Sequence, residues 1–176
     1  PELGEKALRD GKADFIAMGK ALIADPELPL KVASGRLDEI RPCIGCLRCI
    51  DNQTVKGKGI MCSVNAAVGR ETMSEFKPPE KSKRVLVIGG GPAGIEAARV
   101  AALRGHKVTL YEKQDKLGGQ LLEAVIPPHK DNMKPFLEYL RGQAVKRGVE
   151  VKAGFEATRQ IVSEAKPDVA VLAAGV

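Results

Sequence analysis

The amino-acid sequence predicts an α/β fold built on a parallel sheet. Only 3% of the 176 residues are aromatic and none is Trp, so the interior must be built from Val, Ile, Leu and Ala, as in buried parallel strands. The second half of the chain alternates short apolar strands with helical segments. With 44% hydrophobic residues, a chain of this length can bury a core.

The first part of the chain predicts a helix, a strand and a second helix. Residues 1–11 form the first helix, which ends at Gly11, ADFIAMGK at 13–20 forms a short buried strand, and DPELPLKVASG at 25–35 forms a turn and a short helix. One strand cannot make a domain alone, and the chain stops at LAAGV directly after another strand. We therefore expect the chain to be a fragment of a longer polypeptide.

The sequence changes in character after residue 70. Two prolines and many charges predict a linker over residues 71–83. Beyond it, RVLVIG predicts a strand, PAGIEAARVAALRG a helix and HKVTLYE a second strand, which together begin a βαβ unit. A further helix at NMKPFLEYLRGQAVKRG and strands at VEVKAG and DVAVLAAG follow.

The charge pattern excludes several classes of partner. The net charge is +6, but the basic residues are scattered except for KSKR at 81–84, and no aromatic platform for stacking bases is present. No apolar run approaches the roughly 18 residues of a membrane span, and no secretory signal is visible. We expect a cytoplasmic protein that binds neither nucleic acid nor membrane, and a homo-oligomer stays open as an alternative to a monomer.

Four cysteines lie in one segment with the spacing Cys43-x2-Cys46-x2-Cys49-x12-Cys62. Thiolates bind soft metals, and a triple with a distant fourth thiol is typical of one [4Fe–4S] cluster. A structural zinc site usually presents two separated pairs, and a CxxCxxC triple has poor disulfide geometry. Zinc, disulfides and free thiols remain open as less favoured alternatives.

A glycine loop, Gly89-x-Gly91-x-x-Gly94, follows an apolar strand and opens a helix, which is the context that a dinucleotide-binding loop requires. Gly91 would let the backbone approach a pyrophosphate at the helix N-terminus. Glu112 ends the next strand about 20 residues on, where an acid accepts hydrogen bonds from ribose hydroxyls and disfavours a 2′-phosphate. The later LGGQL at 117–121 favours FAD over NAD.

With both motifs in view, the chain resembles the iron–sulfur flavoenzymes of the Old Yellow Enzyme class, which include 2,4-dienoyl-CoA reductase, 2-enoate reductase and trimethylamine dehydrogenase. The similar stretches are DFIAMGKALIADPELPLK, RPCIGCLRCI with MCSVNAAVGRE, and KRVLVIGGGPAGIEAA with VTLYEK and LGGQL. The x2, x2, x12 cysteine spacing is closer to trimethylamine dehydrogenase, whereas LGGQL and PPHK favour a reductase.

The resemblance implies a division into four parts. Residues 1–40 would end an FMN-binding TIM barrel, 41–70 would hold the cluster, 71–83 would be the linker, and 84–176 would begin a Rossmann-like FAD or ADP domain. The implied cofactor-binding residues are Gly19, Lys20, Gly89, Gly91, Pro92, Ala93, Gly94, Glu112, Lys113, Gly119, Gln120, Lys130 and Ala157. The implied cluster ligands are Cys43, Cys46, Cys49 and Cys62.

The implied activity is an NAD(P)H-dependent oxidoreductase that passes electrons from FAD through the cluster to FMN and reduces an activated C=C bond of a small molecule. The fragment alone would be inactive, and no catalytic residue lies within it. The alternatives are an amine dehydrogenase of the trimethylamine dehydrogenase type, with ADP in the dinucleotide site, or a non-enzymatic module that binds zinc and a nucleotide.

Overall fold

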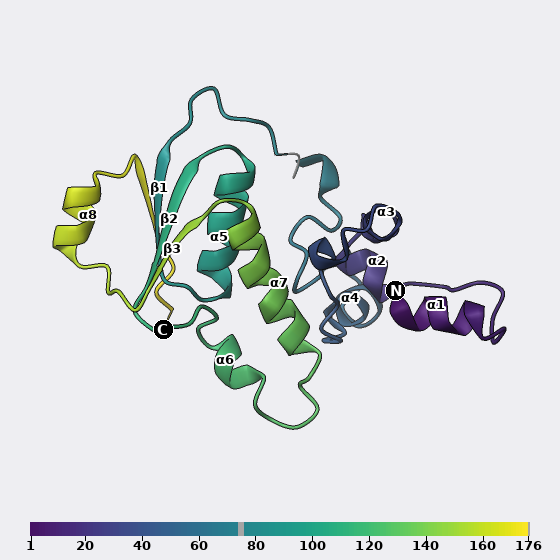
Figure 1. Cartoon of the computed structure of the whole chain (residues 1–176). Coiled ribbons are helices and arrows are strands. Elements are labelled where there is room, and N and C mark those ends of the chain that lie inside the picture. Colours follow the sequence, from purple (N-terminus) through teal and green to yellow (C-terminus); the bar gives the residue numbers. More distant parts are fainter. Residues whose placement is uncertain (74–75, 176) are drawn as a thin grey trace. The chain divides into compact units, whose positions relative to one another are not determined.

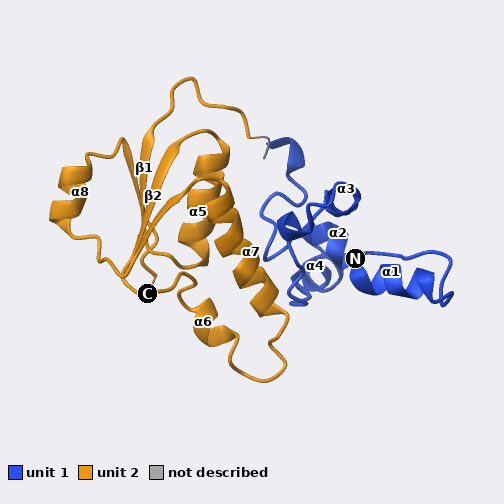
Figure 2. Ribbon diagram, in the orientation of Figure 1, with its two compact units in different colours: residues 1–73 blue, residues 74–176 orange. Residues whose placement is uncertain are grey.

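A computed structural model describes residues 1–73 and 76–175 of the chain. It divides into two units, residues 1–73 and residues 74–176, and the boundary falls inside the predicted linker (Figure 2). Each unit has its own helices, and the strands lie in the second.

Residues 76–175 form a four-stranded parallel sheet (Figure 1). Its strands are β1 (Arg84–Ile88), β2 (Lys107–Glu112), β3 (Glu150–Ala153) and β4 (Val169–Leu172), in the order β3-β2-β1-β4. β1 lies between β2 and β4 and pairs in parallel with both. The predicted parallel α/β fold is therefore confirmed for this unit.

Helices connect the strands of this sheet. The helix α5 (Pro92–Leu103) follows β1, α6 (Leu121–Ala124) and α7 (Met133–Lys146) follow β2, and α8 (Arg159–Ala165) follows β3. α5 contacts α7 as well as β1 and β2, whereas α8 lies across the sheet from them (Figure 1). This placement agrees with right-handed crossovers, because the chain moves from β1 to β3 in one direction and returns to β4 in the other.

The core of the second unit lies between the sheet and the α5–α7 pair. Val87 of β1, Ile95 of α5 and Leu110 of β2 are the largest fully enclosed side chains of the described residues. Each contributes roughly 2 kcal/mol through burial. The packing of α5 on β1 and β2 holds the end of β1 against the start of α5 and so positions the glycine loop between them.

The first unit consists of short helices and loops. Its elements are α1 (Glu2–Arg9), α2 (Lys20–Ala24), α3 (Leu28–Ala33), η1 (Leu37–Glu39), α4 (Arg48–Ile50), η2 (Asp51–Val55) and η3 (Glu71–Met73). The predicted helix over residues 1–11 is confirmed by α1, and Gly11 follows it with φ of 64°. None of the described helices is both long and apolar enough to cross a membrane.

The buried strand predicted at residues 13–20 is wrong. Residues 13–18 adopt no regular secondary structure, and Phe15 is 91% exposed. A strand forms by pairing its backbone with a neighbour, and residues 1–73 contain no strand to pair with. The end of a TIM barrel, predicted for residues 1–40, is not seen as a barrel element and stays a prediction.

Candidate functional site

The glycine loop between β1 and α5 packs closely against the rest of the protein at Gly89 and Gly94, whereas Gly91 has empty space beside it. Gly89 has φ of 106°, and its N–H donates to the Tyr111 carbonyl at 2.8 Å. A Cβ on Gly94 would lie 1.8 Å from the Gly89 carbonyl oxygen, so only glycine fits there. A Cβ on Gly91 would meet no atom within 4 Å. Gly91 therefore faces the open space that a ligand needs.

The N-terminus of α5 lies at the same loop. Gly91 is the N-cap, Pro92 is the first helical residue, and no side chain caps the helix. Ala93, in the first turn, is exposed. Uncapped N–H groups and the helix dipole make this end a favourable place for a phosphate.

A second glycine loop packs directly on the first. Gly118 donates its N–H to the Gly90 carbonyl at 2.7 Å. A Cβ on Gly119 would lie only 2.9 Å from the Cα of Gly91. Arg141 of α7 holds this loop from behind, because its Nε donates to the Leu117 carbonyl at 2.9 Å and its Nη2 donates to the same oxygen. The exposed Gln120 follows the loop at the start of α6.

Glu112 lies at the end of β2 beside both loops. It is 7% exposed, and its Oε2 accepts a hydrogen bond of 2.6 Å from the Gly90 N–H. Its Oε1 accepts one of 2.9 Å from the Gln114 N–H. Each carboxylate oxygen has a further lone pair, so the group can still accept a ribose hydroxyl.

The structure brings most of the predicted dinucleotide residues together and leaves three on flanking segments. Hydrogen bonds and close backbone approaches link the glycines at 89, 91, 94 and 119 with Glu112. Lys113 follows β2, Lys130 lies after α6, and both are exposed. Ala157 precedes α8 in a loop that returns to β2, where Phe155 donates its N–H to the Glu112 carbonyl at 3.0 Å.

All four cysteines are free thiols, and Cys49 is the buried one. The Gly45 N–H donates to Cys43 Sγ at 3.4 Å, and a hydrogen bond of 3.3 Å joins Cys46 Sγ to Ser63 Oγ, next to Cys62. Within residues 1–73 and 76–175, no three Cys, His, Asp or Glu side chains are placed to hold a metal. The ligand set thus stays a prediction, although its chemistry fits an iron–sulfur cluster.

The surroundings of Cys46 favour its thiolate. Burial alone raises the pKa of the Cys46 thiol, but hydrogen bonding with the Ser63 side chain and with backbone groups lowers that pKa below its ordinary value. An open cavity of about 570 Å³ beside Cys62 is lined in part by Arg48, Lys58 and Arg70. These three side chains give the wall of the cavity a positive charge.

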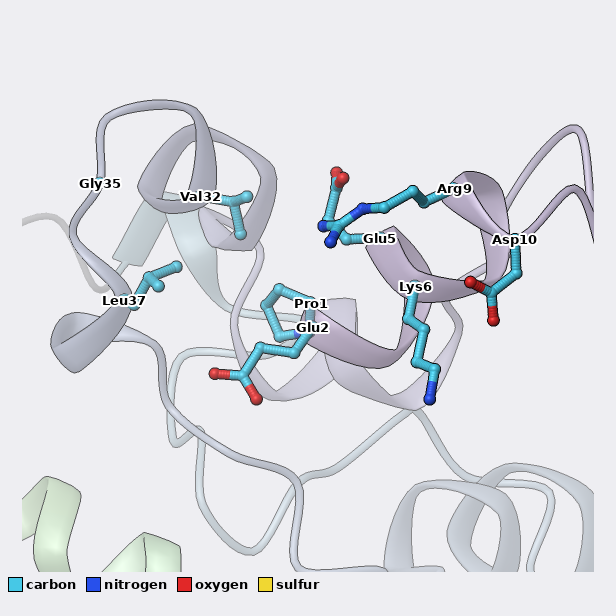
Figure 3. A pocket seen from close by; sticks show the side chains of 9 residues that line it. All are labelled: Pro1, Glu2, Glu5, Lys6, Arg9, Asp10, Val32, Gly35 and Leu37. Carbon is cyan, nitrogen blue, oxygen red and sulfur yellow. The ribbon is translucent and has the colours of Figure 1, made fainter.

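The two residues predicted to bind an FMN phosphate lie at the start of α2. Gly19 is the N-cap and Lys20 is exposed. A separate cavity of about 600 Å³ lies against α1, where charged side chains such as Glu5 meet Val32 and Leu37 (Figure 3). Neither predicted phosphate-binding residue lines this cavity, and their role stays a prediction.

Sequence reasoning missed the polar side chains that support the two sites. These are Arg141 behind the second glycine loop, and Asp25, Lys31, Asn52 and Asn65 around the cysteine segment. Each is an ordinary polar residue in the sequence, and no spacing rule singles it out.

Known proteins provide the comparison for these sites. Residues 84–170 match the family described as FAD dependent oxidoreductase. The chain is 45% identical over 99% of its length to an NADH oxidase of Thermoanaerobacter brockii, of which it covers 27%. It is 41% identical over 99% of its length to a cinnamate reductase of Clostridium sporogenes, of which it covers 26%.

Solved structures agree with this relationship. A 2-naphthoyl-CoA reductase superposes with a TM-score of 0.95 at 38% identity, over 99% of this chain and 27% of that one. Histamine dehydrogenase from Rhizobium sp. 4-9 superposes with a TM-score of 0.92 at 32% identity, over 99% of this chain and 26% of that one. This chain therefore spans about 27% of the length of the relatives that it matches. By this similarity over nearly its whole length, the chain belongs to the Old Yellow Enzyme and trimethylamine dehydrogenase class of flavin and iron–sulfur oxidoreductases.

Proposed function

We propose that this chain supplies the dinucleotide site and the iron–sulfur segment of an NAD(P)H-dependent enzyme that reduces an activated C=C bond of the 2-enoate or dienoyl-CoA type. The observation that carries the proposal is the joint presence of a dinucleotide cradle and a four-thiol segment in a chain 45% identical to an NADH oxidase and 41% identical to a cinnamate reductase. Electrons from NAD(P)H would pass from FAD through the cluster to FMN, where a small-molecule substrate is reduced.

The dinucleotide site uses the open side of the two glycine loops. The amides at the start of α5 bind the pyrophosphate, and the missing side chain of Gly91 makes room for it. Glu112, already held by two backbone amides, accepts the ribose hydroxyls. Gln120, Lys113, Lys130 and Ala157 complete the contacts to FAD or, in an ADP-binding version of the site, to ADP.

The cysteine segment binds one [4Fe–4S] cluster through Cys43, Cys46, Cys49 and Cys62. When bound, such a cluster supplies one-electron transfer between two-electron carriers. The lowered pKa of Cys46 favours the thiolate that binds metal, and Arg48, Lys58 and Arg70 line the neighbouring cavity. Free thiols of this kind suit the reducing cytoplasm. Gly19 and Lys20 bind the FMN phosphate.

Metal analysis tests the proposal on the chain itself. The chain is produced and purified without oxygen and reconstituted with ferrous iron and sulfide. We expect about four iron and four sulfide per chain, as one [4Fe–4S] cluster requires. A colourless protein that takes up zinc and no iron would instead support a zinc and nucleotide-binding module.

An amine dehydrogenase is the second candidate. It is favoured by the x2, x2, x12 cysteine spacing and by the similarity to histamine dehydrogenase at a TM-score of 0.92. In the whole enzyme, anaerobic bleaching of the flavin absorbance by NADH supports the reductase. Bleaching by an amine, and not by NADH, supports the dehydrogenase.

A further inference from the structure

A buried ion pair lies at the C-terminal end of α2, in the unit that contains the cysteines. Asp25 is 2% exposed and Lys31 is 8% exposed. The Lys31 ammonium donates to both carboxylate oxygens of Asp25, at 2.9 and 2.7 Å. Burying two charges is costly unless further hydrogen bonds satisfy them, so the remaining partners of Asp25 indicate its purpose.

Those partners include the start of the cysteine segment. Asp25 Oδ2 accepts a hydrogen bond of 2.7 Å from the backbone N–H of Arg41, two residues before Cys43. Its Oδ1 accepts one of 3.1 Å from the N–H of Glu27, at the start of α3. One carboxylate therefore joins α2, α3 and the entry to the cysteine segment.

The end of the same segment is attached to Ile23 of α2, two residues before Asp25. Asn65 is 4% exposed and lies three residues after Cys62. Its Nδ2 donates to the Ile23 carbonyl at 2.9 Å, at the last turn of α2. Its Oδ1 accepts a hydrogen bond of 3.1 Å from the Ala67 N–H, which fixes the orientation of the amide.

We propose that Asp25 and Asn65 are positioning residues that hold the two ends of the cysteine segment on the C-terminal end of α2. All four thiols lie between Arg41 and Asn65, so the two attachments turn the segment into a closed loop before any metal binds. Closing this loop in advance removes part of the ordering cost of ligation. The significance of the loop for a cluster rests on the proposed function, whereas the closure itself does not.

Hydrogen exchange in the metal-free chain tests the closure without any cofactor. Asn65→Leu should make the backbone amides of residues 43–62 exchange about tenfold faster, because each lost buried hydrogen bond frees one end of the loop. The amides of β1 and β2 in the second unit serve as the internal reference and should not change.

Paired variants separate the Arg41 attachment from the ion pair. Asp25→Leu with Lys31→Met removes both, whereas Asp25→Asn with Lys31→Met removes the charges and keeps an oxygen for the Arg41 amide. We expect fast exchange in residues 43–62 only for the first pair. Equal exchange in both pairs would overturn the role assigned to the Asp25 acceptor.

Leu28→Ala is the control for general destabilisation. Leu28 is 4% exposed on α3, and its apolar side chain makes none of these hydrogen bonds. If Leu28→Ala, at a similar loss of thermal stability, speeds exchange in residues 43–62 as much as Asn65→Leu does, the positioning role is refuted for both residues.

The iron-loaded chain gives the second measurement. Asn65→Leu should lose iron to a chelator about tenfold faster than the unchanged chain and should alter the electron paramagnetic resonance spectrum of the reduced protein, while Leu28→Ala leaves the spectrum unchanged. An unchanged chain that binds no iron would refute the proposed cluster, and the exchange experiment would still decide whether Asp25 and Asn65 close the loop.

Discussion

At the scale of single residues, Gly91 and Gly94 lack a side chain for different reasons. A Cβ on Gly91 meets nothing within 4 Å, and its φ of −74° suits any residue. We therefore expect Gly91→Ala to change the free energy of unfolding by less than about 0.5 kcal/mol. The added methyl group occupies the space left for the pyrophosphate, so calorimetry should show ADP affinity falling by about tenfold or more.

Gly94→Ala is the matched counterpart. Its Cβ would lie 1.8 Å from the Gly89 carbonyl oxygen, so the β1–α5 junction must move apart. We expect a loss of about 3 kcal/mol in the free energy of unfolding, measured by denaturant titration. If Gly91→Ala proves as destabilising as Gly94→Ala, then Gly91 serves the fold and not a ligand.

Glu112 is the residue expected to choose between nucleotides. Glu112→Gln removes the charge and leaves only one side-chain oxygen for two backbone amides, those of Gly90 and Gln114. We expect ADP to bind about tenfold more weakly and the preference for ADP over NADP to shrink, because the repulsion of a 2′-phosphate is lost. Calorimetry measures both ligands, with the exposed Glu164→Gln on α8 as the control. A wild-type chain that prefers NADP would contradict this role.

At the scale of elements, the sequence predicts best what local chemistry determines. The β1–α5–β2 unit could be predicted because its apolar strands, its glycine loop and its helix agree with one another in the sequence. α8 was missed because it has only seven helical residues. Its cap is the Thr158 side chain, which accepts a hydrogen bond of 3.3 Å from the Ile161 N–H. The strand at residues 13–20 was predicted wrongly, because pairing depends on partners that local sequence does not reveal.

The supporting side chains of both sites are harder still to predict. Asn65 and Ile23 are 42 residues apart, and Arg141 and Leu117 are 24 apart. Such contacts depend on tertiary packing and leave no periodic pattern. The motifs of the candidate sites could therefore be predicted from the sequence, whereas the residues that hold these motifs in place could not.

Arg141 links α7 to the second glycine loop, and its removal should act on cofactor binding. Arg141→Leu deletes two donors to the Leu117 carbonyl and frees a loop that packs on Gly91. We expect FAD affinity to fall by about tenfold, with Arg141→Lys intermediate, because lysine can replace only part of the fork. Fluorescence quenching of FAD measures the effect.

Glu138→Gln is the control for this prediction. It breaks the ion pair of 2.9 Å between Glu138 and Arg141, in which Glu138 is 69% exposed, and leaves the contact with Leu117 intact. Exposed pairs of this kind contribute little. If Glu138→Gln weakens FAD binding as much as Arg141→Leu does, the loss of FAD affinity comes from the changed surface charge and not from the lost support of the loop.

At the scale of the whole molecule, the chain joins two units with different tasks. Residues 84–172 contain the sheet and the dinucleotide cradle, and residues 1–73 contain the thiols and the polar residues around them. The second unit has a core of its own, with Val87, Ile95 and Leu110 fully enclosed. Each unit should therefore keep its binding function when the other is damaged.

Cys49→Ser tests this independence. Cys49 is the buried thiol of the four, so its loss should abolish retention of the iron–sulfur cluster after anaerobic reconstitution, as shown by iron and sulfide analysis. Changes at separate sites without shared contacts add nearly independently, so the ADP dissociation constant should stay within about twofold. The thermal transition of residues 1–73 should fall in temperature relative to that of the iron-loaded chain, because metal ligation contributes folding energy. A large loss of ADP affinity in Cys49→Ser, with the sheet still folded by hydrogen exchange, would mean that the cysteine segment supports the dinucleotide site directly and that the two units do not act separately.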